Sequence, residues 1–328
     1  MIILGNKYFN NKMTVKRNKK VSLTPYYYTD FGQAYLGDSL ELMKQLSDSS
    51  INLILTSPPF ALTRQKEYGN KQEQDYIDWF MQFSKEFYRL LVDNGSLVID
   101  LGGAYLPGHP VRSIYQYELL VRLCREQNFF LAQEFFHYNP ARLPTPAEWV
   151  TVRRIRVKDS VNIVWWLSKT ENPKSDNKQV LKPYSDSMKA LLKNGYKAQL
   201  RPSGHDISDK FGNDNGGAIP PNLLELANTE SNSYYMKKCK ELGIKPHPAR
   251  FPKDFADFFI KFATDEDDLV LDPFAGSNTT GYAAEKLERR WIAMEINEPY
   301  LEGSKIRFEE ETDLFKTAVK LNGAAQKV

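Results

Sequence analysis

The stretch Ile51-Asn52-Leu53-Ile54-Leu55-Thr56-Ser57-Pro58-Pro59-Phe60 decides the fold class. Its apolar run, residues 51–56, is bounded by prolines and is typical of a buried β-strand. Two consecutive prolines cannot continue that strand, because each lacks an N–H group and has a fixed φ angle. The chain must therefore leave the sheet in a stiff, extended turn at the strand's carboxyl end, where open α/β sheets bind ligands. The turn presents the Ser57 hydroxyl, two restrained carbonyls and the Phe60 ring, which together can bind a planar amine.

Strand-like and helix-like segments alternate on both sides of this stretch. We expect strands at 34–36, 96–100, 129–137, 161–168, 269–272 and 291–295, and helices at 39–46, 75–92, 113–126, 253–263 and 279–289. This alternation predicts an α/β fold, with a mostly parallel sheet between two layers of helices. Trp165 and Trp166 alternate across one strand, so we expect at least one in the core and the other in the wall of a pocket.

The composition is that of an ordinary globular chain. Of its 328 residues, 41% are hydrophobic and 26% are charged. Cys124 and Cys239 are far apart and form no CxxC motif, which favours a reducing cytoplasm over a disulfide framework. The four histidines lack the paired spacing of metal ligands, so we expect no metal site. No apolar run reaches the roughly 18 residues that a membrane span needs, so we expect no membrane association.

Charge is segregated along the chain. Residues 1–30 carry six basic side chains against one acidic, and residues 141–210 carry 14 against 7. Residues 261–328 carry 9 against 14. A basic middle beside an acidic end is typical of a surface for a polyanion, although lysines and arginines that merely solvate helices would give the same pattern. Residues 171–235 are rich in Asn, Ser, Lys, Asp, Gly and Pro without a period, which indicates either disorder or a recognition element.

A second informative stretch runs from 269 to 295. A short strand ends in Asp272, a turn containing Gly276 follows, and a helix starts at Thr279; the next strand ends in Glu295. Such a turn lets a ligand approach the backbone, and the final acid can accept hydrogen bonds from ribose hydroxyls. Neither GxGxxG nor GxxxxGK[ST] occurs, which argues for a nucleoside ligand without phosphates.

TSPPF at 56–60 and DPFAGSNTTG at 272–281 together resemble the amino-type DNA methyltransferases that use S-adenosylmethionine. The order, with SPPF first and DPFAGS last, resembles their circularly permuted beta class, and serine at the head of SPPF resembles the cytosine-N4 enzymes. The resemblance covers most of 33–310 and implies a Rossmann-like methyltransferase fold with a loop-rich insertion. The expected parts are a basic tail (1–30), a catalytic half (31–170), a target-recognition region (171–240), a cofactor-binding half (241–310) and a C-terminal tail (311–328).

The strand ends and the resemblance together predict the site residues. The expected catalytic residues are Ser57, Pro58, Pro59, Phe60 and Asp100. The expected cofactor-binding residues are Asp38, Arg250, Phe251, Asp272, Phe274, Gly276, Ser277, Asn278, Thr279 and Glu295. The expected DNA-binding residues are Arg153, Arg154, Arg156, Lys158, Lys174, Lys182, Arg201, His205 and Asn215. Asp38 could be only a helix cap, and Asn278 stands where many family members have glycine.

The resemblance implies chemistry at an exocyclic amine whose lone pair is delocalised into a ring. Ser57 Oγ and the Pro58 carbonyl would accept both N–H groups and so direct the lone pair at a sulfonium methyl group. A base in a duplex must flip out to reach them, and Phe60 would stack on it. Asp100 would orient Ser57 or take up the proton, or else bond nearby backbone as strand-end acids do.

We therefore expect a sequence-specific DNA methyltransferase acting on the N4 atom of a flipped cytosine in double-stranded DNA. The resemblance implies a protective role beside a restriction endonuclease and CAGCTG as the target. The alternatives are adenine-N6 methylation on the same fold and a non-catalytic nucleic-acid-binding protein with a degenerate cofactor domain. The expected state is a cytoplasmic monomer or weak dimer.

Overall fold

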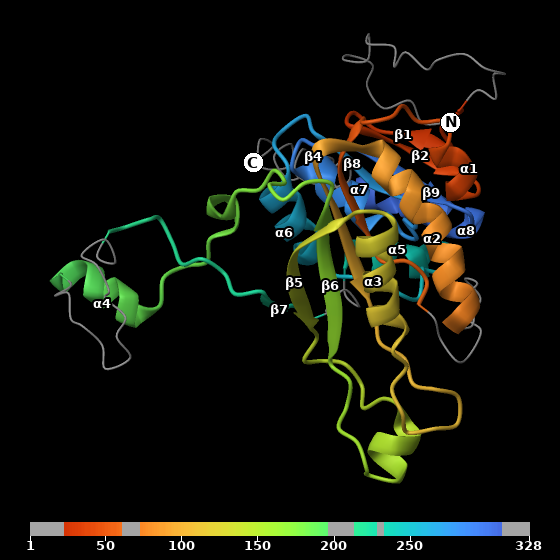
Figure 1. Cartoon of the computed structure of the whole chain (residues 1–328). Helices are drawn as coiled ribbons and strands as arrows, with labels where there is room; N and C mark the ends of the chain where they lie inside the picture. Colours follow the sequence, from red (N-terminus) through yellow and green to blue (C-terminus); the bar gives the residue numbers. More distant parts are fainter. Residues whose placement is uncertain (1–22, 61–72, 196–212, 228–232, 310–328) are drawn as a thin grey trace, which may run out of the picture.

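The computed structural model describes residues 23–60, 73–195, 213–227 and 233–309, and a sheet of nine strands lies at its centre (Figure 1). The strand order is β1-β2-β9-β8-β3-β4-β6-β5-β7. Strands β2, β9, β8, β3 and β4 are parallel, whereas β6 is antiparallel to both of its neighbours. The strands are β1 (Tyr27–Tyr28), β2 (Gly32–Leu36), β3 (Ile51–Thr56), β4 (Leu91–Leu101), β5 (Phe130–Tyr138), β6 (Val161–Ser168), β7 (Leu223–Glu225), β8 (Leu269–Asp272) and β9 (Arg290–Glu295).

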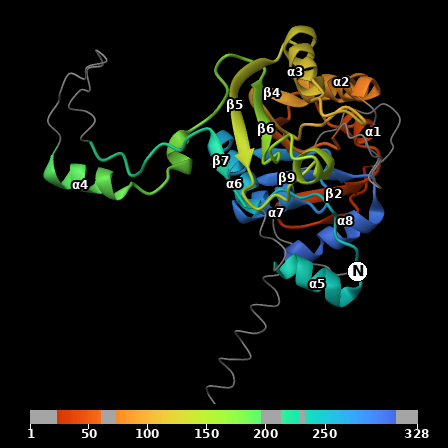
Figure 2. The ribbon, with the colours of Figure 1, turned by 90° about the horizontal axis from the view of Figure 1, so that it is seen from below.

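Helices cover both faces of the sheet (Figure 2). One layer contains α1 (Ser39–Met43), α2 (Glu73–Leu90) and α3 (Tyr115–Glu126); the other contains α6 (Lys253–Ala263), α7 (Thr279–Lys286) and α8 (Glu298–Ser304). Strand β3 has a continuous apolar sequence because it packs on both layers: Ile54 belongs to one buried cluster, and Leu53 and Leu55 to the other. The predicted α/β fold class is confirmed.

The two tryptophans of β6 both belong to the core. Trp165 packs with the α1–α3 layer and Trp166 with the α6–α7 layer, as the alternation of strand side chains requires. The indole N–H of Trp166 donates to Ser96 Oγ at 2.8 Å, so its polar atom has a hydrogen-bond partner inside the core. The expectation that one of them lines a pocket is therefore wrong, because β6 is covered on both faces.

Part of the region expected to be rich in loops is helical. Between residues 171 and 242 lie a 3-10 turn (Asn177–Val180), α4 (Asp186–Asn194) and α5 (Tyr234–Leu242). Helix α4 has no buried residue and lies well away from the sheet in both views (Figures 1 and 2). At the other end, β1 pairs with β2, so the sheet begins inside the expected tail 1–30. The rest of that tail, 1–22, and the expected tail 311–328 lie outside the described residues. None of the described helices is long and apolar enough to cross a bilayer.

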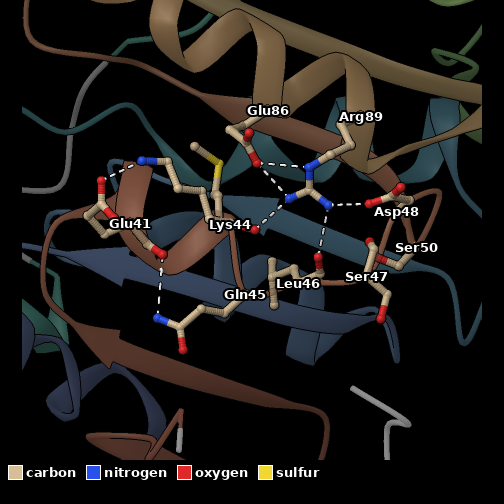
Figure 3. Close-up of polar contacts among 10 residues, drawn as sticks. Glu41, Lys44, Gln45, Leu46, Ser47, Asp48, Ser50, Glu86 and Arg89 are labelled. Carbon is tan, nitrogen blue, oxygen red and sulfur yellow. Dashed lines mark hydrogen bonds and ion pairs between the residues drawn. The ribbon is translucent and has the colours of Figure 1, made fainter. Parts of the chain in front are cut away.

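Arg89 of α2 fixes the connection that leads from α1 into β3 (Figure 3). Its guanidinium donates to the main-chain oxygens of Met43 at 2.8 Å and Leu46 at 2.9 Å. It also forms ion pairs with Asp48 at 2.5 Å and with Glu86 at 2.6 Å. A planar fork of donors is needed to serve all four partners at once, and only arginine provides it.

We expect Arg89→Lys to lower the free energy of unfolding by about 1–3 kcal/mol, because an ammonium group cannot replace the forked hydrogen bonds to buried carbonyls. Urea denaturation measures this change. The matched control is Lys85→Arg on the exposed side of the same helix, which should alter stability by less than about 0.5 kcal/mol. Equal stabilities for the two variants would contradict this role for Arg89.

Candidate active site

A cavity of about 740 Å³ opens at the carboxyl ends of β3, β4, β8 and β9. It brings together most of the residues that the sequence predicts for catalysis and cofactor binding. The predicted residues in its wall are Asp38, Ser57, Pro58, Pro59, Phe60, Asp100, Arg250, Phe251, Asp272, Phe274, Gly276, Ser277, Thr279 and Glu295. The carboxyl ends of neighbouring parallel strands meet at one edge of the sheet, so two motifs remote in sequence share one cavity.

Asp272 joins the two motifs directly. Its Oδ1 accepts a hydrogen bond from Thr56 Oγ1 at 2.8 Å and from the Phe274 N–H at 3.1 Å, and its Oδ2 accepts from Thr280 Oγ1 at 2.6 Å. Burial raises the pKa of Asp272 to about 6, and these three hydrogen bonds limit the rise. The carboxylate is thus ionised at neutral pH and can face a cationic ligand.

Glu295 holds the turn that carries Gly276. Its carboxylate accepts from the Gly276 N–H at 2.8 Å and from the Asn297 N–H at 2.8 Å, and burial raises its pKa. Gly276 has φ of +53°, and a Cβ there would lie 3.2 Å from the ring of His247. Glycine is favoured here by the left-handed backbone angle, and a side chain would crowd the His247 ring. Asp38 caps α1 through the Leu40 N–H at 2.8 Å and also lines the cavity, so both expectations for it fit its position.

Aromatic rings form the side of the cavity next to α2. Phe274 lies 5.6 Å from Trp79 and 5.0 Å from Phe83, measured between ring centroids. Sequence analysis predicted Phe274 but missed the other two, because aromatic residues on the apolar stripe of a helix are usually core. The three rings give an apolar wall next to acidic turns, a combination that suits a nucleoside.

Ser57 is held by main chain. Its hydroxyl donates to the Asp100 carbonyl oxygen at 3.1 Å. A hydroxyl has one proton and two lone pairs, so this bond leaves Ser57 Oγ as an acceptor for the cavity. Asp100 thus contacts Ser57 as expected, but through its carbonyl and not its carboxylate. Phe60 rests on Gly102, where a Cβ would lie 2.4 Å from the ring.

His137 is a cavity residue that sequence analysis missed. It lies near the end of β5 next to Asp100, and its Nδ1 lies 3.6 Å from Asp100 Oδ2. Its ring packs against Phe255 of α6 at 5.0 Å between centroids. The rule that ligands bind at strand ends could have found it, since it is the last residue of an expected strand. Asn139, Arg142 and Asn162 line the same side of the cavity.

Asn278 does not line the cavity, although we expected it to bind cofactor. It is fully buried in the left-handed region with φ of +53°, and its Oδ1 caps α7 by accepting from the Gly281 N–H at 3.0 Å. Its Nδ2 donates to the Tyr27 hydroxyl at 2.9 Å. Asparagine suits this position because it tolerates a positive φ and caps helices, so it replaces glycine without blocking the turn.

Four of the expected DNA-binding residues lie together in one connection, whose ends include the cavity residues Asn139 and Asn162. Arg153, Arg154, Arg156 and Lys158 are exposed in the segment between β5 and β6, beside a π-helical turn (Glu148–Val152). Arg156 donates to the Pro110 carbonyl, and Lys158 donates to two main-chain carbonyls at the base of the segment. These two side chains therefore also hold the segment in place.

The remaining DNA-binding candidates are scattered. Lys182 and Asn215 lie on the two described segments next to α4, which we call the arm. The main chain of Lys182 forms a β-bridge with that of Ala218, and the Asn215 N–H donates to a tyrosine hydroxyl. Lys174 forms ion pairs with Asp265 and Asp268 at 2.6 Å each, at the sheet edge opposite the cavity. Arg201 and His205 lie outside the described residues.

We expect Asn278→Ala to lower the free energy of unfolding by about 2 kcal/mol, because alanine loses the cap and is strained at positive φ. Asn278→Gly also loses the capping side chain, but glycine adopts a positive φ without strain. This variant should therefore be more stable than Asn278→Ala by about 1 kcal/mol. Thermal and urea unfolding of both variants measure the difference. Equal destabilisation would contradict the assignment of backbone strain to this position.

The comparisons with known proteins identify the family of this chain. A family model described as DNA methylase matches residues 51–306. The type II methyltransferase M.PvuII of Proteus hauseri is 52% identical over 303 residues, which are 91% of this chain and 90% of that protein. The type II methyltransferase M.BamHI of Bacillus amyloliquefaciens is 27% identical and covers 96% of this chain and 70% of its own length.

Solved structures give the same result. The structure of the PvuII DNA methyltransferase (cytosine-N4-specific) matches with a TM-score of 0.72 and 46% identity, covering 89% of this chain and 94% of that one. TTHA0409 from Thermus thermophilus, complexed with S-adenosyl-L-methionine, shares the fold at a TM-score of 0.53 and 18% identity, covering 85% and 93% of the two chains. The expected resemblance is confirmed, and the chain belongs to the DNA methylase family.

Proposed function

We propose that this methyltransferase transfers the methyl group of S-adenosylmethionine to the exocyclic N4 atom of a cytosine flipped out of duplex DNA. The observation that carries the proposal is the fixed Ser57 hydroxyl, which donates to the Asp100 carbonyl at 3.1 Å and faces the same cavity as Asp272 and Glu295. Ser57, as acceptor for the amine, and Asp272, as carboxylate for the cation, then lie in the wall of one cavity.

The chain's own residues account for the binding half of the mechanism. S-adenosylmethionine supplies an electrophilic methyl group on a positively charged sulfur. Asp272 is ionised at neutral pH and attracts the positive charge of the methionine part, and Glu295 is available to the ribose hydroxyls. The ring of Phe274, with its aromatic neighbours, offers a flat apolar surface for adenine.

Two rigid hydrogen-bond acceptors prepare the target amine for methyl transfer. Ser57 Oγ and the Pro58 carbonyl accept the two N–H groups of the target amine, which draws its nitrogen towards tetrahedral geometry and frees the lone pair. Both acceptors lie on a chain stiffened by consecutive prolines, so they need no reorganisation during the reaction. Phe60 stacks on the extruded ring and offsets the stacking lost from the duplex.

Cytosine is favoured over adenine by the serine that begins the SPPF turn and by 52% identity to M.PvuII, whose structure is titled cytosine-N4-specific. Adenine-N6 methylation would use the same acceptors, and the identity of the methylated nucleoside separates the two. The names of the relatives as type II methyltransferases support a protective role beside a restriction endonuclease. We further propose CAGCTG as the target and a cytoplasmic monomer or weak dimer as the state of the protein.

DNA contact is proposed for the basic segment between β5 and β6. Arg153 and Arg154 are exposed there, and Arg153 lies over the Trp149 ring at 5.1 Å from its centroid. The segment begins and ends at cavity residues, so phosphates bound to it would hold a duplex at the cavity mouth. Lys182 and Asn215 would add contacts from the arm that carries α4.

Replacing Ser57 by alanine should slow methylation of a CAGCTG duplex about a hundredfold or more, because one of the two fixed amine acceptors is lost. Affinity for S-adenosylmethionine should stay within about twofold, since Ser57 faces the base side of the cavity. Single-turnover transfer of a labelled methyl group measures the rate, and mass spectrometry of digested DNA identifies the nucleoside.

The control is Ser47→Ala on an exposed turn, which should leave the rate unchanged. The proposal predicts N4-methylcytosine as the product. N6-methyladenine would redirect it to the other amine, and full activity of the Ser57→Ala variant would remove the serine from the mechanism.

Affinity for S-adenosylmethionine should weaken as pH falls through about 6. The pKa of Asp272, raised to about 6 by burial, means that its charge is present above this pH and lost below it. A ligand that requires the ionised form loses up to about tenfold in affinity for each pH unit below the pKa. Isothermal titration calorimetry between pH 5 and 8 measures the dependence.

Asp272→Asn should bind more weakly at pH 8 and lose most of this dependence. Asp267→Asn is the matched control, because Asp267 is exposed and has a positive φ of 64° that asparagine tolerates. A dissociation constant of the unsubstituted chain that is constant from pH 5 to 8 would argue against Asp272 as the cation partner.

A further inference from the structure

A buried arginine holds the turn between β8 and α7. Arg307 follows α8 and is 5% exposed. Its Nε donates to the Ser277 main-chain oxygen at 2.8 Å, and its Nη2 donates to Ser277 Oγ at 3.1 Å. Removing a guanidinium from water is costly unless hydrogen bonds replace the lost hydration. Two of those bonds go to one residue of the cavity wall, although Arg307 itself does not line the cavity.

Ser277 lies between two residues with an uncommon backbone conformation. Gly276 and Asn278 both have φ of +53°. The left-handed region is open to glycine but costs more for asparagine, so the surroundings must hold the turn on this path. Glu295 accepts from the Gly276 N–H, and Asn278 is held by its cap on α7. Arg307 supplies the corresponding hold on the residue between them.

The same hydrogen bonds determine what Ser277 can offer to a ligand. A guanidinium has only donors, so Ser277 Oγ must be the acceptor in its bond from Arg307. The hydroxyl proton of Ser277 is not used in that bond and can be donated to an acceptor atom in the cavity. Arg307 thus fixes both the main chain and the hydroxyl oxygen of a cavity residue.

An aromatic ring of α5 fixes the guanidinium of Arg307 in turn. Tyr235 is 2% exposed, and Arg307 Cζ lies 4.4 Å from its ring centroid. Arg250 Cζ lies 5.9 Å from the same centroid, and Arg250 lines the cavity. The face of an aromatic ring attracts a guanidinium and limits the orientations of its donors. One ring therefore contacts both an arginine behind the cavity wall and an arginine in it.

Helix α5 packs closely beside α8 (Figure 2). Tyr235 and Ile306 belong to one buried cluster, and Ile244 packs against it. A Cβ on Gly303 of α8 would lie 3.2 Å from Ile244 and 3.8 Å from the Tyr235 hydroxyl. The missing side chain lets α5 and the connection after it approach α8. Most of α5 falls in the region 171–240, where we expected target recognition, yet its buried face packs on the cofactor-binding half.

We propose that Arg307 and Tyr235 are positioning residues for the cofactor. Arg307 fixes Ser277 in the cavity wall, and Tyr235 fixes Arg307. The inference rests on the position proposed above for S-adenosylmethionine, beside Asp272 and Glu295. Because these two residues hold the turn in place before the ligand arrives, their loss weakens cofactor binding. Methyl transfer from a saturated cavity changes little, because neither residue lies at the amine acceptor.

Isothermal titration calorimetry with S-adenosylmethionine tests the proposal. Arg307→Lys keeps the charge but replaces a planar fork by one ammonium group, so the dissociation constant should rise about tenfold. Tyr235→Leu removes the ring and should raise it about fivefold, whereas Tyr235→Phe keeps the ring and should stay within about twofold. Single-turnover transfer at saturating cofactor should remain within about threefold of the unsubstituted chain for all three variants.

Arg290→Lys is the matched control. Arg290 is exposed at the opposite end of β9 from Glu295, and its Nε donates to the Asp267 carbonyl. The control should bind S-adenosylmethionine as the unsubstituted chain does. Urea denaturation of every variant separates positioning from stability, because a merely structural role would lower the midpoint of unfolding without changing the dissociation constant of the folded protein.

Unchanged affinity in Arg307→Lys and Tyr235→Leu, beside weaker binding in Asp272→Asn, would overturn the inference and leave the proposed cofactor site standing. Unchanged affinity in all three variants would overturn both. A loss in Tyr235→Phe as large as that in Tyr235→Leu would contradict the role of the ring. Arg307→Lys, which keeps the charge and the aliphatic stem, decides the outcome if Tyr235→Leu does not fold.

Discussion

The buried hydrogen bond from Thr56 Oγ1 to Asp272 Oδ1 joins two segments that lie 216 positions apart in the chain. It forms because β3 and β8 are parallel neighbours, so their carboxyl ends meet at one edge of the sheet. The other residues of the site lie on either side of this hydrogen bond. Asp272 and Glu295 shape the turns on one side, and Ser57 leaves the sheet on the other. The permuted order of the two motifs has no consequence for the cavity, because sheet order and not chain order determines which strand ends are adjacent.

The acids of the cavity divide into two kinds. Asp272 and Glu295 use their oxygens for hydrogen bonds from hydroxyl and N–H groups, which fix the turns and keep negative charge next to a cation. Asp100 instead uses its main-chain oxygen to hold Ser57 and leaves carboxylate capacity unused beside His137. The carboxylates on one side of the cavity are therefore engaged at both oxygens, whereas Asp100 on the other side keeps an oxygen without a hydrogen-bond partner among the described residues. This division follows from the hydrogen bonds alone.

Much of the fold was predictable, and so was most of the site. Strand 51–56 and helix 253–263 have the predicted bounds, because a continuous apolar run and a strong helical stripe leave little alternative. Helix α4 was missed although Ser185 caps it and Met188, Leu191 and Leu192 lie on one face, because the loop-rich composition of 171–235 around it concealed so short a period. Asn278 was expected to bind cofactor, but its side chain caps α7, because a turn motif shows which residues are near a ligand and not which way each side chain points. His137 was missed because no motif marks it, although it ends an expected strand and so could have been found by its position.

The central claim is that a rigid hydroxyl-bearing turn and an acidic turn face one cavity that holds an extruded cytosine. The most direct measurement is a crystal structure of the chain with a CAGCTG duplex and a non-reactive analogue of S-adenosylmethionine. The account predicts a flipped cytosine whose N4 lies about 3 Å from both Ser57 Oγ and the Pro58 carbonyl oxygen, on the side facing Asp272. A cytosine that stays stacked in the duplex, or an N4 atom turned away from Ser57 in the occupied cavity, would contradict it.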